Sequence, residues 1–396
     1  MAKQIIVLFF LSVYLVGCGF EENSSAAAVP LSQDNQTVTN AEFVWQLPSN
    51  IAPPSVPEDN PMSNEKVTLG RFLFYDKQLS ANVSQACADC HQQDKAFSDG
   101  QVTAIGSTGI LHPRNSQSLV NAAFNHSLTW NNPKVTSIEQ QIAIPLFGSS
   151  PVEMGLSEQN KNSVLARFQE SPHYINLFNK AFPNESVPIN FNSIVKSIAA
   201  FIRTLNSYNS AFDRFQQGET NALSPSAQRG MALFLSERLA CTQCHSGINF
   251  NQPSDTVILT GNNNIFQNIG LFNVDNQGGY PLGNQGLIEF THLKEDMGKF
   301  RIPSLRNVEL SAPYMHDGSV VTLDDVLDVY SAGGRFVAAG DKAGDGRINP
   351  FKNVAIKGFS LAEQDKKDVI SFLNSLTDKE FINNAAFSNP SLSSQK

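Results

Sequence analysis

The sequence predicts a mostly α-helical protein built from two tandem halves, and three repeated features predict this fold. The string GRFLF at 70–74 recurs as GMALF at 230–234, with apolar residues at helical spacing. A Cys-x-x-Cys-His motif follows each string, and each half closes on an amphipathic helix. The 396 residues are enough for two or three domains with a sizeable core.

The helices at the ends of the halves carry their own signals. Ser224 is a good N-cap for the helix that opens the second half, with Pro225 in its first position. Ser360 and Glu363 predict a capping box at the start of the helix that closes it. The apolar positions of the two closing helices recur at helical spacing: Ile194, Val195, Ile198, Phe201, Ile202 and Leu205 in the first half, and Val369, Ile370, Phe372, Leu373 and Leu376 in the second.

The composition excludes several classes of protein. Hydrophobic side chains make up 41% of the chain and charged ones 16%, which excludes disorder throughout. The formal net charge of −8 provides no basic field for phosphates, so we expect no nucleic-acid partner. Five cysteines are too few for a scaffold held by disulfides.

The N-terminus predicts export to the cell envelope. Residues 1–17 have the basic start, apolar stretch and small-residue end of a signal peptide, and the stretch is too short to span a membrane comfortably. The string LVGC at 15–18 resembles a bacterial lipobox and predicts lipidation of Cys18; an ordinary signal peptide with an incidental cysteine is the alternative. Gly19 favours the outer membrane of a Gram-negative cell, with residues 18–41 as a flexible tether on its periplasmic side.

The two Cys-x-x-Cys-His motifs predict covalently bound haem. They consist of Cys87, Cys90 and His91 in the first half, and of Cys241, Cys244 and His245 in the second. Two thioethers attach the porphyrin, and the histidine that follows presents its imidazole to the iron. Zinc is the alternative, but the two pairs lie about 150 residues apart, far beyond zinc-ribbon spacing. We therefore expect two tandem cytochrome c-like domains with one haem c each, at 42–220 and 221–382, and a tail at 383–396.

From about Pro61 to Phe381 the chain resembles the bacterial di-haem cytochrome c peroxidase superfamily, and it is most similar to the branch of MauG and the di-haem enzyme of methanobactin operons (MbnH-like). The strings that carry the resemblance, besides both haem motifs, are LGRFLFYD at 69–76, PRNS at 113–116, PVEM at 151–154, PSLRN at 303–307 and APYMHDG at 312–318. The methanobactin-type branch is indicated by VWQLP at 44–48, DNPMS at 59–63 and YSAGGR at 330–335.

The resemblance implies that the first haem, held by His91, reacts with hydrogen peroxide. Ser107 stands where a histidine caps this iron in resting peroxidases, and serine is a poor iron ligand, so we expect an open site. His112 as a ligand is the alternative. Glu153 is implied as the group that moves a proton between the peroxide oxygens, with Gln140 as its hydrogen-bonding neighbour. Without the resemblance, Glu153 would be interpreted as a helix N-terminal carboxylate.

The resemblance also implies that the second haem, held by His245, takes Tyr330 as its other ligand. Tyr330 lies fourteen residues after His316, where the peroxidases have methionine and MauG has tyrosine. A phenolate favours the higher oxidation states of iron, so the two haems would share two oxidising equivalents. The alternative is that Tyr330 is an ordinary core aromatic, with Met297 or Met315 as the ligand.

Two further sites are implied by the resemblance alone. Trp130 stands at the position of the tryptophan that relays electrons between the haems, whereas Trp45 is interpreted as a packing residue. A calcium ion is implied, held by the Asn115 side chain and the main-chain oxygens of Ser311 and Pro313.

Three functions remain open at this level. In the first, the haem pair uses hydrogen peroxide to oxidise a side chain of a partner protein, a tryptophan, by long-range electron transfer. In the second, the protein is a cytochrome c peroxidase that reduces hydrogen peroxide to water with electrons from a periplasmic cytochrome c or cupredoxin. In the third it is a di-haem electron carrier, which requires strong sixth ligands on both irons. Ser107 and Tyr330 favour the first.

Overall fold

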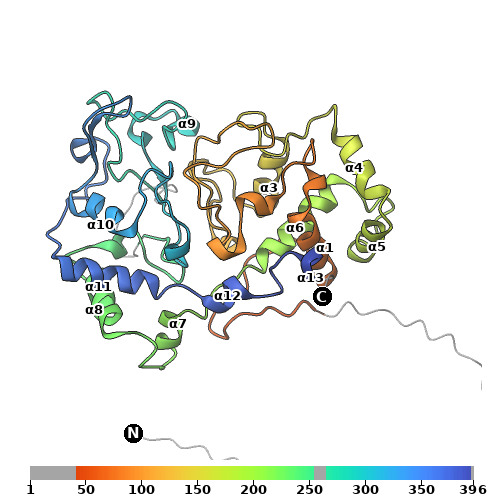
Figure 1. The fold of residues 1–396 in the computed structure, drawn as a ribbon, viewed down its shortest axis with the longest axis horizontal. Helices are drawn as coiled ribbons and strands as arrows, with labels where there is room; N and C mark the ends of the chain where they lie inside the picture. Colours follow the sequence, from red (N-terminus) through yellow and green to blue (C-terminus); the bar gives the residue numbers. More distant parts are fainter. Residues whose placement is uncertain (1–41, 254–264, 394–396) are drawn as a thin grey trace, which may run out of the picture. The chain divides into compact units, whose positions relative to one another are not determined.

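The computed structural model describes residues 42–253 and 265–393. The predicted signal peptide, the lipidation site Cys18 and the tether lie outside the described residues. Regular structure in the described part is almost entirely helical, as predicted, with two small antiparallel strand pairs (Figure 1). None of the described helices is long and apolar enough to cross a membrane.

The α-helices are α1 (Asn64–Tyr75), α2 (Cys87–Cys90), α3 (Ile138–Phe147), α4 (Lys161–Gln169), α5 (Pro172–Ala181), α6 (Phe191–Arg203), α7 (Ala211–Gln216), α8 (Pro225–Phe234), α9 (Ile288–Thr291), α10 (Leu323–Ser331), α11 (Glu363–Asn374), α12 (Lys379–Asn383) and α13 (Pro390–Ser393). The 3₁₀ turns are η1 (Lys77–Leu79), η2 (Gln93–Lys95), η3 (Ala122–Phe124), η4 (Cys241–Gln243), η5 (Lys294–Asp296), η6 (Val308–Leu310) and η7 (Gly346–Ile348). Strand β1 (Phe266–Gln267) pairs with β2 (Phe300–Arg301), and β3 (Phe336–Val337) with β4 (Gly344–Asp345).

The first half is organised around the crossing of α1 and α6. Ser63 caps α1 by accepting the Lys66 N–H, and Asn190 caps α6 by accepting the Ser193 N–H. The helices meet at Gly70, where an added Cβ would lie 1.9 Å from the main-chain oxygen of Ser197. Only glycine allows such a close approach of two backbones.

The second half repeats this crossing with α8 and α11, which lie side by side in Figure 1. Ser224 caps α8 and Pro225 occupies its first turn, as predicted. A Cβ at Gly230 would lie 1.8 Å from the main-chain oxygen of Asp368, so the glycine has the same role as in the first half. The internal repeat predicted from the sequence is therefore confirmed as a repeated helix pair.

The predicted capping box at the start of α11 is wrong. The helix begins at Glu363 with Ala362 as its N-cap, and no side chain caps it. A capping box requires its hydroxyl at the N-cap and its carboxylate at the third helical position. Because Ser360 lies two residues before the N-cap, its pairing with Glu363 has the right spacing but the wrong register.

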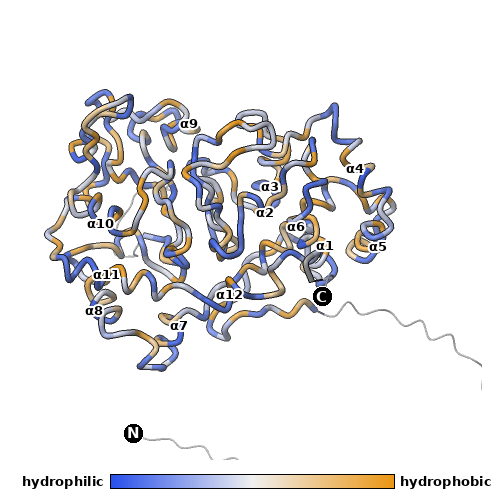
Figure 2. The backbone as a smooth tube through the Cα atoms, viewed as in Figure 1, coloured by the Kyte–Doolittle hydropathy of each residue, from blue (hydrophilic) through white to orange (hydrophobic). Residues whose placement is uncertain are grey.

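Each half has its own buried core, and a smaller third cluster includes Phe300 and Val329. The first-half core also contains Phe381, because the chain returns to the first half after α11. There the Tyr75 hydroxyl donates to the main-chain oxygen of Phe387 at 2.6 Å. Figure 2 shows that apolar residues are spread in short stretches over the elements of both halves. The division at residue 220 into two haem domains stays a prediction.

Buried polar contacts hold the two halves against each other. Arg114 of the first half and Glu289 of the second form an ion pair at 2.8 Å, and both side chains are largely buried. The Asn121 amide donates to Asn249 Oδ1 at 2.8 Å, also in the interior. Buried charges and amides with satisfied partners fix a specific arrangement, so these contacts favour one packing of the two halves.

Candidate active site

The two motif histidines are held in the same way. The Nδ1 atom of His91 lies 2.8 Å from the main-chain oxygen of Phe97, and that of His245 lies 2.8 Å from the main-chain oxygen of Phe250. A carbonyl oxygen only accepts, so Nδ1 carries the proton and Nε2 keeps its lone pair for a metal. Burial lowers the pKa of both imidazoles, which keeps them in the neutral form that binds iron.

The four motif cysteines are not paired as disulfides. Burial raises the pKa of Cys87, Cys90 and Cys241 to about 12 and that of Cys244 to about 11. In the described part of the chain, no three His, Cys, Asp or Glu side chains gather as a metal ion would require. A zinc site needs three or four such ligands, so the geometry of the described residues does not favour the zinc interpretation.

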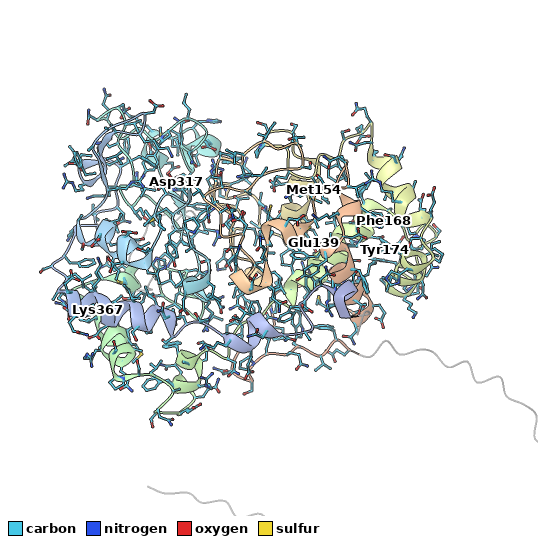
Figure 3. All side chains as sticks on the ribbon, viewed as in Figure 1. Glu139, Met154, Phe168, Tyr174, Asp317 and Lys367 are labelled. Atoms are coloured by element: carbon cyan, nitrogen blue, oxygen red, sulfur yellow. The ribbon has the colours of Figure 1, made fainter. Side chains whose placement is uncertain are left out.

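A cavity of about 50 Å³ lies beside the first motif, and we call it the first cavity. It is lined by Cys87, Cys90 and His91 and by the predicted acid–base residue Glu153, together with His112. Met154, the next residue after Glu153, also lines it and is labelled in Figure 3. The structure therefore brings Glu153 to the haem motif from 66 residues further along the chain.

Ser107 and His112 lie on the loop that covers this cavity. The Ser107 N–H donates to the main-chain oxygen of Glu153 at 2.7 Å, and the Ser107 hydroxyl lies against Gly155. His112 directs Nε2 toward Glu153 Oε1 at 3.6 Å. The alternative of His112 as an iron ligand is not favoured, because the free end of its imidazole faces a carboxylate.

Gln140 does not take the predicted position beside Glu153. Its side-chain oxygen accepts from the N–H groups of Thr136 and Ser137 and caps α3, and Gln140 is not among the residues that line the first cavity. The third residue of a helix turns its side chain back to the N-cap, which explains the difference.

Gln141, the next residue, is a second candidate for this amide, although it too is absent from the lining of the first cavity. Its buried Oε1 has no hydrogen-bond partner among the described residues. Gln141 lies one helical turn before Pro145, which lines the first cavity, so both share a face of α3. Reading the helix register from Ser137 as the N-cap would have distinguished Gln141 from Gln140.

A larger cavity of about 240 Å³ lies beside the second motif, and we call it the second cavity. Cys241, Cys244 and His245 line it, and α10 contributes Tyr330. Burial and the nearby Cys244 and Cys241 raise the pKa of the Tyr330 phenol above its ordinary range. Of the rival ligands, Met315 lines this cavity, whereas Met297 does not.

His316 supplies an independent indication that the second cavity holds a large cofactor. Its ring is stacked on that of Phe300 with centroids 3.5 Å apart, and burial lowers its pKa to about 3. Its Nε2 atom is buried and has no hydrogen-bond partner among the described residues. Buried polar atoms are almost always satisfied. His316 lines the second cavity, so a bound group with polar edges, such as a haem, fits this atom.

The predicted relay and calcium residues also gather at the second cavity, which Trp130, Asn115, Ser311 and Pro313 line. Trp130 Nε1 donates to the main-chain oxygen of Asn115 at 2.9 Å. The Asn115 amide nitrogen donates to the main-chain oxygen of Gln101 at 2.7 Å, which leaves its side-chain oxygen as the group for a cation. Calcium at this place stays a prediction.

Comparisons with known proteins agree with this arrangement. The family model described as di-haem cytochrome c peroxidase matches residues 64–221. The chain is 31% identical over 353 residues to the methylamine utilization protein MauG of Methylorubrum extorquens, which covers 89% of both proteins. It is 34% identical over 359 residues to the cytochrome-c peroxidase IdrP1 of a Pseudomonas species, with 87% of this chain and 89% of the relative covered.

Among solved structures, the chain matches the crystal structure of a MauG-like protein associated with microbial copper homeostasis. The two are 45% identical with a TM-score of 0.84, and the match covers 88% of this chain and 99% of the other. Taken with the two Cys-x-x-Cys-His motifs and their histidine seats, these similarities establish that the chain belongs to the di-haem cytochrome c peroxidase and MauG family of haem-dependent oxidoreductases, a family that implies two c-type haems.

Proposed function

We propose that this protein uses hydrogen peroxide to remove electrons from a tryptophan side chain of a partner protein that docks at its surface. His91 and His245 would hold the two haems, which would supply a peroxide-reactive iron at His91 and redox capacity for two oxidising equivalents. The chain's own residues would move the proton, hold the second iron and carry electrons between the sites. The partner's side chain would never enter the first cavity.

The observation that carries this proposal is that Tyr330 lines the second cavity together with His245. A tyrosine oxygen favours the higher oxidation states of iron, whereas a methionine sulfur favours reduced iron and a high reduction potential. A stored oxidising equivalent suits the modification of a protein. A high potential suits a peroxidase that accepts electrons from a small cytochrome.

Glu153 would move a proton between the two oxygens of peroxide, because its carboxyl lines the first cavity beside Cys87 and His91. We propose Gln141, rather than Gln140, as the amide that assists it. Trp130 would relay electrons, since it lines the second cavity and is fixed by its hydrogen bond to Asn115. A calcium ion on Asn115, Ser311 and Pro313 would stabilise this region.

The similarity to the structure associated with copper homeostasis suggests the class of partner. We propose that the oxidised partner is a protein that handles copper in the cell envelope. The predicted signal peptide and Cys18 support a location on the periplasmic side, with a lipid anchor at the outer membrane.

The test is a peroxide titration of the ferric holoprotein, followed by Mössbauer and near-infrared spectroscopy. We expect a long-lived oxidised state at both haems in the wild type, which Tyr330→Met abolishes. Met315→Leu is the matched control, because Met315 is the rival ligand in the same cavity. It should leave that state unchanged, and loss of the state in Met315→Leu alone would assign the ligand to Met315. Rapid turnover of a reduced cytochrome c by the wild type, with no long-lived oxidised state, would establish the peroxidase function instead.

A further inference from the structure

We propose that His112 positions Glu153 and relays protons between it and the solvent. The inference rests on the proposed function, because it assigns a new residue to the same site. The haem motifs do not require a histidine at this place, and a carboxyl that gives up a proton must take one back before the next cycle. His112 supplies both a partner and a path.

The first step is the contact between the two side chains. His112 Nε2 lies 3.6 Å from Glu153 Oε1, within the range of an ion pair, and both residues line the first cavity. Their side chains are 24% and 32% exposed. The pair therefore connects the cavity on one side with solvent on the other.

The second step concerns the hydrogen-bond partners of the other imidazole nitrogen, Nδ1. His112 Nδ1 lies 3.1 Å from the main-chain nitrogen of Arg114 and 3.2 Å from its main-chain oxygen. When Nδ1 is unprotonated it accepts from the N–H, and when it is protonated it donates to the oxygen. The imidazole thus has a partner in the neutral and in the charged form, while Nε2 keeps facing Glu153. A group that has a hydrogen-bond partner in either form suits a proton relay.

The third step is that the backbone at residues 112–114, which holds the imidazole, is firmly anchored. The Arg114 guanidinium forms two hydrogen bonds to Glu289, at 2.8 and 2.9 Å, and a third to Asn131 at 3.0 Å. The intervening Pro113 restricts His112 to extended backbone, and the Pro113 oxygen accepts from Asn284 at 3.1 Å. A backbone anchored in this way holds the imidazole against Glu153 without further support.

The loop itself is tied to the segment that carries Glu153. The His112 N–H donates to the Ala104 oxygen at 2.7 Å, which closes the loop, and Ser107 binds the main chain of Glu153. At Gly106 an added Cβ would lie 1.9 Å from the Val152 oxygen, so the two segments are in direct backbone contact. The distance between His112 and Glu153 is therefore set by the fold.

Few other ionisable groups face this pair. Cys87, Cys90 and His91 share the cavity but are the haem-binding residues. The Asp99 carboxylate accepts a hydrogen bond from the Ser116 hydroxyl at 2.9 Å, and the Arg114 guanidinium forms an ion pair with Glu289. Of the ionisable side chains that line the first cavity and do not belong to the haem motif, His112 is the partner of Glu153, at 3.6 Å.

The test uses cyanide binding to the ferric holoprotein, followed by the Soret shift across pH 5–9. Hydrogen cyanide must lose its proton as it binds, so its association rate reports the proton acceptor in the cavity. We expect His112→Leu to slow association about tenfold or more and to flatten its pH profile. His112→Gln keeps an N–H donor toward Glu153 but cannot accept a proton and pass it on, so it should stay as slow as His112→Leu. Wild-type rates and profile in both variants would overturn the inference.

Two controls separate this inference from the proposed function. His126→Gln replaces an exposed histidine that does not line the first cavity, and it should bind cyanide as the wild type does. The infrared carboxyl band that disappears in Glu153→Gln should titrate at a shifted pH in His112→Leu; an unshifted band would also overturn the inference. A wild-type protein whose first haem binds neither cyanide nor peroxide would refute the proposed function itself.

Discussion

Gly70 lies directly against the main-chain oxygen of Ser197, at a distance that excludes any side chain. A Cβ at position 70 would be 1.9 Å from that oxygen and 2.4 Å from the carbonyl carbon. The contact joins α1, which leads into the first haem motif, to α6, which closes the first half. Gly230 and Asp368 repeat the relationship between α8 and α11.

Gly70→Ala should therefore separate α1 from α6 and destabilise the protein. Overpacking of a tight contact typically costs about 1–3 kcal/mol, and a backbone neighbour cannot relax by changing rotamer. The free energy of unfolding from urea titration measures the loss. Thr68→Ala, at an exposed position of the same helix, is the control and should change it by less than about 0.5 kcal/mol. Equal effects of the two substitutions would contradict the close-packing argument.

Glu153→Gln should slow the reaction of the ferric protein with peroxide by about 10² to 10⁴. Glutamine keeps the size of the side chain but cannot exchange a proton, so the loss isolates the acid–base role. Stopped-flow measurement of the Soret change gives the rate. Glu158→Gln replaces a carboxylate whose side chain is 79% exposed, and its rate should equal that of the wild type. Unchanged kinetics in Glu153→Gln would remove that residue from the chemistry.

Adjacent glutamines on α3 allow a matched comparison. Gln141→Leu should alter the peroxide reaction, because its buried amide oxygen lies on the helix face that reaches the first cavity. Gln140→Leu should leave that reaction unchanged and lower the free energy of unfolding by about 1 kcal/mol, since it removes a helix cap. The rate and the urea midpoint of each variant decide between the two residues. A slower reaction in Gln140→Leu alone would restore the assignment made from the sequence.

Gln140 and Gln141 also show which parts of the fold and the site can be predicted from the sequence. The two Gly-x-x-x-Phe helices, their closing helices and the haem motifs were predictable because each depends on local spacing. The role given to Gln140 came from the resemblance alone, and it overlooked the Ser137 and Gln140 capping pattern that turns this side chain back to the N-cap. The contact of His112 with Glu153 depends on a loop that folds back on a segment 41 residues further along. No local pattern encodes that distance.

Removing one partner of the buried ion pair of Arg203 and Glu139 should strongly lower the free energy of unfolding. Arg203 Nη2 donates to Glu139 Oε2 at 2.8 Å, and the two side chains are 3% and 19% exposed. Burial alone would raise the pKa of Glu139, but hydrogen bonds from Arg203 and Asn60 lower it. Arg203→Met leaves the carboxylate buried without its partner and should cost about 3–5 kcal/mol.

Adding Glu139→Gln to Arg203→Met should recover part of that loss, because the uncompensated charge is gone. Arg238→Met is the surface control: its pair with Asp365 at 2.7 Å has side chains 49% and 28% exposed, so the cost should not exceed about 1 kcal/mol. Urea unfolding of the four proteins measures these differences. A double variant less stable than Arg203→Met would show that the cavity, and not the lost charge partner, dominates.

Because of Asp368, the free energy of unfolding should fall as the pH is lowered through a defined range. Hydrogen bonds from Arg229 and Ser226 lower the pKa of Asp368 to about 2, below the ordinary value of about 3.9. A carboxyl whose pKa is lower in the folded state stabilises the protein fully above the unfolded value, and this contribution disappears as the pH falls through the folded one. The stability difference between wild type and Asp368→Asn should therefore be constant above about pH 4.5 and shrink toward pH 2.

Ser226→Ala, which removes one of the hydrogen bonds at 2.6 Å, should shift this decline to higher pH. Urea unfolding followed by circular dichroism from pH 2 to 6 measures all three proteins, and a difference that stays constant down to pH 2 would contradict the lowered pKa.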